Sequence, residues 1–243
     1  KVVAASSDND NTFDEDQTTS FAQTHANDES EKWYYAGDKG VLYEGIIKNI
    51  KGKYYAFWPD DDGAGKGGAM LTGLCVLQME NGSSDQIVKV IDDDIDSDAL
   101  DDILDGTYKG QDAWDENVRL YYFGNNEDSD GAMKTGNVTI NLDGDSYQFQ
   151  FSKTGGAEGK GRGLNGIDDS KYIYKFGMKL KAGSDDKYIV VYADGDTGAS
   201  NVTVHKIDTA ELRKAATPAG QNKDGDTVNA LGTIGYVDNG SIV

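Results

Sequence analysis

The chain has 243 residues, enough for one or two hydrophobic cores, and it contains 31 glycines but only two prolines. A net charge of −20 disfavours binding to nucleic-acid phosphates or anionic lipid, and a single cysteine, Cys75, excludes an internal disulfide and a cysteine-rich metal site. No apolar run is long enough to span a membrane, and no signal peptide is recognisable, although the first residues could follow a removed one. Many glycines without proline, together with 14 tyrosines, indicate an all-β chain with many tight turns.

The acidic residues are concentrated in two segments. Residues 1–32 hold eight acidic residues and two lysines, and residues 91–116 hold eleven acidic residues and one lysine. The charge is therefore a property of a tail and an insertion, and we expect it to be mainly solvated. We predict that residues 1–32 are an acidic tail or a truncated repeat.

From Trp33 onward one pattern recurs along the chain. An aromatic cluster is followed by a polar glycine-rich turn, a short phrase that ends in glycine, and an apolar strand. Spacings of 20 to 50 residues between copies are typical of arrays in which each unit buries its apolar face against its neighbour. The sequence therefore predicts an all-β, solenoid-like array of short β-hairpin repeats, each with two strands around a tight turn. The copies begin at Trp33, Tyr54, Leu120, Tyr147 and Tyr172, and their closing glycines are Gly45, Gly73, Gly136, Gly166 and Gly183.

The copies occupy residues 33–82 and 117–183, and residues 83–116 between them are an acidic insertion or a degenerate repeat. Within 83–116 the pattern predicts a strand from Gln86 to Ile91 and a short helix from Asp98 to Leu104. Aspartates stand early in this helix, where the helix dipole favours them, and apolar residues share one face.

Residues 184–243 are predicted to be a β-rich C-terminal segment. Strands are expected at 187–192 and 201–207, and a second short helix begins at 208 or 209 and ends at 216, before Pro218. A closing hairpin is expected within 221–243.

The phrase W-Y-Y followed by G-V-L-Y-E-G, and the phrase Y-Y-F followed by D-S-D-G-A-M-K-T-G, resemble the cell-wall-binding repeats of Gram-positive surface proteins. This family includes choline-binding modules and the glucan-binding repeats of glucosyltransferases and clostridial toxins. Residues 31–52, 53–82 and 120–144 match best, and residues 147–183 match more loosely. The resemblance implies a superhelix of hairpins that binds choline on teichoic acids, or α-glucans, between consecutive hairpins.

The resemblance also implies a carbohydrate-binding platform at Trp33, Tyr35, Tyr55 and Tyr122. The alternative is that these rings pack one hairpin on the next. In choline-binding members a tryptophan follows each closing Thr-Gly and completes an aromatic box for the quaternary ammonium. Because that tryptophan is missing here, weak or no choline binding is expected, and glucan binding or a purely structural role is favoured. The residues at the equivalent positions are Ile46, Leu74, Asn137 and Ile167.

Metal and catalytic signals are weak. The run from Asn126 to Gly131 matches the first half of a calcium loop, but position twelve is Asn137 rather than glutamate, and no metal site is predicted. Neither His25 nor His205 has a nucleophile or metal ligand at motif spacing, so we expect no enzyme activity, no catalytic residue and no cofactor.

These patterns predict a secreted, extracellular, non-catalytic module of the bacterial cell surface. It would attach to the cell wall or to an extracellular polysaccharide by aromatic stacking, with no nucleic-acid partner and no membrane insertion. The alternative is a structural or adhesive repeat spacer that binds no small ligand and recognises a protein partner. A third class is a calcium-stabilised surface module.

Overall fold

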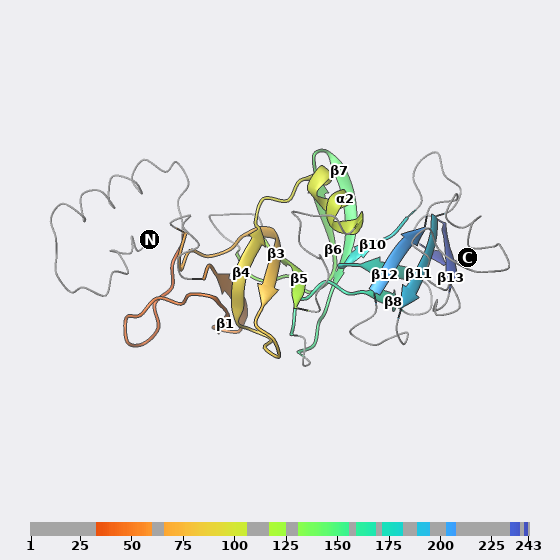
Figure 1. Cartoon of the computed structure of the whole chain (residues 1–243). Coiled ribbons are helices and arrows are strands. Elements are labelled where there is room, and N and C mark those ends of the chain that lie inside the picture. Colours follow the sequence, from red (N-terminus) through yellow and green to blue (C-terminus); the bar gives the residue numbers. More distant parts are fainter. Residues whose placement is uncertain are drawn as a thin grey trace.

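The computed structural model consists mostly of β-strands in small antiparallel sheets, with one short helix among the described residues. The sheets follow one another along the long dimension of the molecule, from β1 (Ile46–Ile50) near one end to β13 (Ile234–Asp238) near the other (Figure 1). The predicted all-β class is confirmed for this part of the chain. The structure describes residues 33–59, 66–105, 117–124, 131–155, 159–168, 172–181, 189–194, 203–207, 234–238 and 241–242.

Several sequence-based predictions lie outside the described residues. They are the tail 1–32 with His25, the helix at 208–216, the half calcium loop up to Asp130, and the closing glycine Gly183.

The first sheets form from alternating apolar residues on either side of tight turns. Strands β1 and β2 (Lys53–Phe57) pair in register from Ile46 opposite Phe57 to Ile50 opposite Lys53. A three-stranded sheet follows in the order β4-β3-β5, and all six residues of β5 are buried, as expected for a strand covered on both faces. Its strands are β3 (Gly73–Met79), β4 (Ile87–Asp92) and β5 (Val118–Phe123).

A five-stranded antiparallel sheet has the order β6-β7-β10-β9-β8, and a four-stranded C-terminal sheet has the order β12-β11-β13-β14. In the C-terminal sheet, β13 and β14 form the antiparallel pair expected as a closing hairpin, and β11 and β12 match the two predicted strands to within two residues. The strands are β6 (Gly136–Leu142), β7 (Asp145–Phe151), β8 (Gly166–Asp168), β9 (Tyr172–Lys175), β10 (Met178–Lys179), β11 (Ile189–Asp194), β12 (Thr203–Ile207) and β14 (Ser241–Ile242).

The predicted position of the hairpins within each copy is wrong. The strand after a closing glycine pairs with the aromatic strand of the next copy, so β1 pairs with β2 and β6 pairs with β7. The connecting turns are Lys51-Gly52 and Asp143-Gly144, and their φ values of 52, 87, 51 and 92° are all in the left-handed region. Two-residue turns of this kind match the twist of paired strands, which explains why the hairpins close between copies.

Equivalent residues of the copies make equivalent backbone hydrogen bonds. Four closing glycines lead into a strand with positive φ: 57° at Gly45, 77° at Gly73, 78° at Gly136 and 97° at Gly166. Each aromatic strand also accepts a bond from the glycine phrase of its own copy, through the pairs Tyr43 N–Tyr35 O, Leu71 N–Ala56 O, Lys134 N–Tyr122 O and Leu164 N–Gln150 O.

A second backbone hydrogen bond links the second, third and fourth copies each to the copy before it. The amide in the middle of the glycine phrase donates to the carbonyl of the first residue in the preceding aromatic strand. These bonds satisfy backbone groups that would otherwise be unpaired between sheets. They are Met70 N to Trp33 O at 2.7 Å, Met133 N to Tyr54 O at 2.8 Å and Gly163 N to Leu120 O at 2.8 Å.

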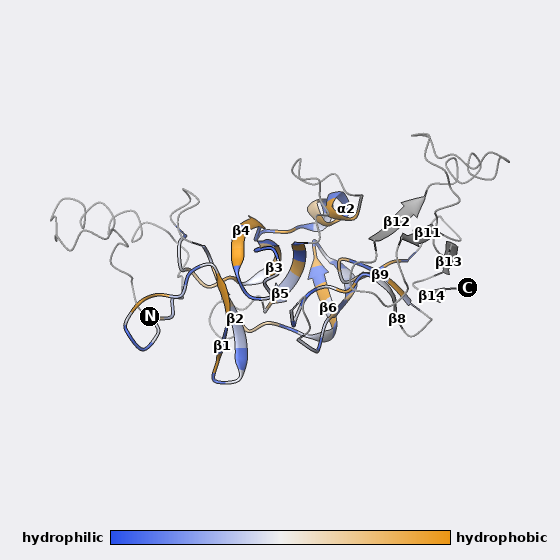
Figure 2. Cartoon of the chain, turned by 60° about the horizontal axis from the view of Figure 1, so that its bottom comes forward, coloured by the Kyte–Doolittle hydropathy of each residue, from blue (hydrophilic) through white to orange (hydrophobic). Residues whose placement is uncertain are grey.

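The insertion contributes the helix α2 (Ser97–Asp105), one residue longer at each end than predicted. Its polar and apolar residues lie on different faces (Figure 2), and Leu100, Ile103 and Leu104 are fully buried. They share one core cluster with residues of the three-stranded and five-stranded sheets, including Leu74, Val76, Leu120, Ile140, Phe149, Phe151 and Ile173. The insertion therefore supplies part of the main core and joins two sheets.

Both ends of α2 are capped by side chains. Asp96 Oδ1 accepts a hydrogen bond from Ala99 N at 2.7 Å, and Asp143 Oδ2, in the β6–β7 turn, accepts one from Ser97 N at 2.8 Å. At the other end, the buried Lys175 Nζ donates to the carbonyl of Leu104. Negative groups at the N-terminus and a positive group at the C-terminus both favour the helix dipole.

Replacing Gly163 by alanine is expected to destabilise the fold by roughly 1–3 kcal/mol. A Cβ there would lie 2.5 Å from Phe176 O and 2.9 Å from Gly177 N, which are backbone atoms that cannot move aside cheaply. Gly155→Ala is the matched control, because a Cβ at Gly155 has nothing within 4 Å. Urea unfolding measures both, and equal midpoints for the two variants would contradict the packing.

Asp143→Asn is expected to lower stability near neutral pH. Hydrogen bonds from the backbone and side chain of Ser97 lower the pKa of the Asp143 carboxyl, so its contribution is present above the unfolded pKa, about 3.9, and is lost as pH falls through the folded value. Asparagine tolerates the positive φ of the turn, so backbone strain is not introduced. Urea midpoints at pH 6 should be lower for Asp143→Asn than for the parent chain, and the difference should shrink at pH 2.5. Asp145→Asn controls for net charge, and an effect as large in that variant would argue against the cap.

Candidate functional site

Two of the four predicted platform residues are exposed on the first copy. Trp33 keeps 37% of its surface exposed and Tyr35 keeps 39%. Tyr34, between them, packs against the core cluster that contains Ala56 and Leu77. The alternation of the extended segment therefore turns one ring inward and leaves its two neighbours facing outward.

Tyr43, which sequence reasoning missed, connects these rings to the first hairpin. Its ring stacks on Tyr35 with centroids 5.7 Å apart and planes 4° apart, and it lies 6.0 Å from the ring of Phe57 at a tilt of 47°. Lys48 places its Nζ 5.3 Å from the centroid of the Tyr43 ring. A comparison of equivalent positions in the copies could have identified Tyr43. The first copy has an aromatic ring at this position, whereas the next three copies have Leu71, Lys134 and Leu164.

Tyr55, the third predicted platform residue, lies on the same face of the β1–β2 hairpin as Lys48. Tyr55 is the direct cross-strand partner of Lys48, and residues that face each other across an antiparallel pair project to the same side. The same alternation puts Lys53 beside Tyr55 on β2. We name this surface the tyrosine–lysine face: Tyr35, Tyr43, Lys48, Lys53 and Tyr55.

Tyr122 cannot serve as a platform in this structure, which corrects the sequence-based assignment. Only 8% of its surface is exposed, and its ring stacks on Phe151 with centroids 6.4 Å apart. Tyr122 and Tyr35 occupy equivalent backbone positions, but Tyr122 is covered by the five-stranded sheet and α2. Its ring contributes to the packing of one sheet on the next, which is the alternative role that the sequence analysis gave for these rings.

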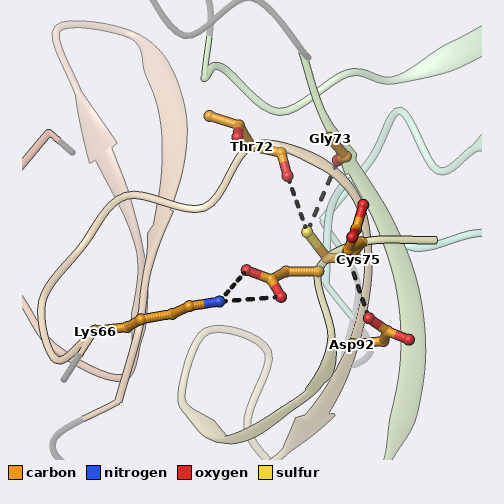
Figure 3. Close-up of polar contacts among 7 residues, drawn as sticks. Lys66, Thr72, Gly73, Cys75 and Asp92 are labelled. Carbon is orange, nitrogen blue, oxygen red and sulfur yellow. Dashed lines mark hydrogen bonds and ion pairs between the residues drawn. The ribbon is translucent and has the colours of Figure 1, made fainter. Parts of the chain in front are cut away.

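A second aromatic ring, that of Trp58, is covered by Lys66, which also pairs with Asp93. Lys66 Nζ lies 4.6 Å from the Trp58 ring centroid and 3.0 Å from Asp93 Oδ2, so the ammonium has both an aromatic and a carboxylate partner. Figure 3 shows Lys66 reaching across toward the segment that carries Asp92. Trp58 itself is buried, with 6% of its surface exposed. This arrangement stabilises a loop, and it leaves no free ring face.

Cys75, close to this group, is a core residue, as predicted from its apolar neighbours. It is fully buried, and its Sγ points to the carbonyls of Thr72 and Gly73 (Figure 3). Burial raises the pKa of the Cys75 thiol well above its ordinary value, and the nearby carboxylates of Asp93 and Asp92 add to that shift. A neutral buried thiol is a poor nucleophile.

Lysines also lie over other rings of the described residues. Lys160 Nζ is 5.1 Å from the Tyr54 centroid, and Lys179 Nζ is 3.8 Å from the Tyr172 centroid. Each lysine supplies the cation–π contact that a ligand cation would need. These rings are therefore satisfied within the chain.

The described residues contain no group of three or more histidine, cysteine, aspartate or glutamate side chains placed to hold a metal ion. Within the same residues, no helix has the length and apolar character needed to cross a membrane.

The sequence matches no family model and no curated protein sequence. Among solved structures, it is similar to choline binding protein F from Streptococcus pneumoniae in crystal form II, with 16% sequence identity and a TM-score of 0.31. The alignment covers 87% of this chain and 44% of that chain. A TM-score of this size is too low to carry an argument about function.

Alanine at Tyr122 and at Tyr35 should have different effects on stability. Tyr122→Ala removes a core ring and is expected to cost roughly 3–5 kcal/mol, whereas Tyr35→Ala removes an exposed ring and should cost less than about 1 kcal/mol. Urea unfolding of the two variants checks this directly. A Tyr35→Ala loss as large as that of Tyr122→Ala would mean that Tyr35 is a structural residue and not a free platform.

Proposed function

We propose that this chain is a non-catalytic module that attaches to a bacterial cell-wall polymer or an extracellular polysaccharide. The observation that carries the proposal is the stacked pair Tyr35–Tyr43, which stands on a hairpin beside the half-exposed Tyr55 and the exposed Trp33. Exposed tyrosine and tryptophan rings offer apolar faces for sugar rings and polar groups for hydroxyls. The module acts outside the cell, at the cell surface.

The repeats form an array of hairpins in this proposal. The recurring bonds from Met70, Met133 and Gly163 to the preceding copies support it, because equivalent atoms join successive copies. The glycine phrases also meet, since a Cβ on Gly131 would collide with Met70 and one on Gly161 would collide with Met133. An array of this kind can present several weak sites to one polymer and bind by avidity.

Choline is a poor fit to these rings. Lysine ammonium groups lie over Tyr43, Tyr54, Trp58 and Tyr172, and a quaternary ammonium would have to displace a cation or approach it. We therefore favour a saccharide ligand over choline.

The second candidate is a structural or adhesive spacer that recognises a protein. It is favoured by the burial of most repeat rings, since Tyr121, Phe123, Phe149 and Phe151 are at most 1% exposed. In this case the aromatic pattern serves packing alone.

Affinity electrophoresis in polysaccharide gels and pull-down with isolated cell walls test the proposal on the whole chain. Tyr35→Ala combined with Tyr43→Leu should weaken retention about tenfold, because two stacking contacts of about 0.7 kcal/mol each are lost. Tyr172→Ala is the control, because Tyr172 is a half-buried ring on β9. If the parent chain is not retained by any polysaccharide or wall preparation, the spacer is the better account.

A further inference from the structure

The tyrosine–lysine face belongs to one of two described stretches of the chain with a clear excess of positive charge, the other being residues 172–181, which hold three lysines and no acidic residue. Residues 33–59 contain four lysines, at positions 39, 48, 51 and 53, and two acidic residues, Asp38 and Glu44. The whole protein carries a net charge of −20. A local basic surface on so acidic a chain calls for a specific explanation.

The lysines of this face are placed beside the rings. Lys48 lies over Tyr43, and Lys53 projects to the same side of the hairpin as Lys48 and Tyr55. Within the described part of the chain, neither Lys48 nor Lys53 makes an ion pair, in contrast to Lys66, whose Nζ lies 3.0 Å from Asp93. Their ammonium groups are available to a ligand.

Most acidic residues of the described chain lie outside residues 33–59. Four of them lie on α2 or at the β6–β7 turn and affect Tyr147. Burial is the main cause that raises the pKa of the Tyr147 hydroxyl, and the four carboxylates add to the shift: Asp145, Asp101, Asp143 and Asp98. On the first copy, Glu44 turns toward Gly68 of the second copy, with its Cγ 3.3 Å from the position of a Cβ there. At physiological salt, charges separated by more than about 8 Å are largely screened, so Lys48 and Lys53 act mainly on ligand groups in their immediate surroundings.

We propose that the tyrosine–lysine face binds an anionic glycopolymer, with sugar rings against Tyr35 and Tyr43 and a carboxylate or phosphodiester against Lys48 and Lys53. This rests on the proposed function and names its ligand class. Stacking alone would accept a neutral glucan equally well. The two ammonium groups add charge-assisted hydrogen bonds that only an acidic polymer can use.

Binding of the whole chain to three probes tests the proposal: polygalacturonate, poly(glycerol phosphate) and neutral dextran of similar length. The two acidic polymers should bind at least about tenfold more tightly than dextran in 20 mM salt, and the preference should fall as salt rises. Lys48→Ala combined with Lys53→Ala should remove the preference, an affinity loss of about tenfold for the acidic polymers relative to dextran measured on the same variant. If only one acidic polymer binds, its charged group identifies the source of the anion.

The matched control is Lys89→Ala with Lys181→Ala, which removes the same charge at exposed positions outside this face. Equal losses in the control and in the Lys48/Lys53 variant would overturn the proposal, because the effect would then be one of net charge. Dextran bound as tightly as the acidic polymers would overturn it while leaving saccharide attachment intact. Retention of none of the three probes and of no wall preparation would count against the proposed function itself. Tighter binding to single-stranded RNA than to the acidic polymers would also overturn the proposal.

Discussion

The structure depends on one backbone constraint that recurs along the chain. A glycine with positive φ ends the phrase of the first four copies, and in the second, third and fourth copies the amide in the middle of the phrase donates to the carbonyl that begins the preceding aromatic strand. Only a residue without a Cβ adopts these φ values at little cost, and the bond then fixes the distance between successive copies. Backbone segments therefore approach each other closely, as at Gly163, where the backbone of Phe176 and Gly177 leaves no room for a methyl group.

The acidic insertion shows how the chain covers an apolar surface where the copies are interrupted. Its helix buries Leu100, Ile103 and Leu104 between two sheets and exposes Asp98, Asp101 and Asp102. Asp143 and Lys175, both from the five-stranded sheet, hold its two ends. The helix dipole is thereby stabilised by groups from distant parts of the chain.

Aromatic residues at equivalent positions are exposed in one copy and buried in another because different segments lie beside them. Within the described residues, the first copy has a neighbouring copy on one side, and Tyr35 stays exposed, whereas Tyr122, at the equivalent position, is covered by a sheet and a helix. Trp58 is unavailable for a different reason, since it is buried and covered by Lys66, which pairs with Asp93. The exposed rings of the first copy and the lysines beside them form the surface to which we assign the proposed ligand.

Local patterns in the amino-acid sequence were sufficient to predict the all-β class, the helix of the insertion, most strand positions and the burial of Cys75, because periodicity, turn residues and helix signals act over a few residues. They also singled out Trp33 and Tyr35, which the structure leaves exposed, and Tyr55, which it leaves half-buried. The pairing of strands between copies, the burial of Tyr122 and the grouping of Tyr43 with Lys48 were decided by tertiary structure. Each depends on which distant segment lies alongside, and no local pattern specifies that.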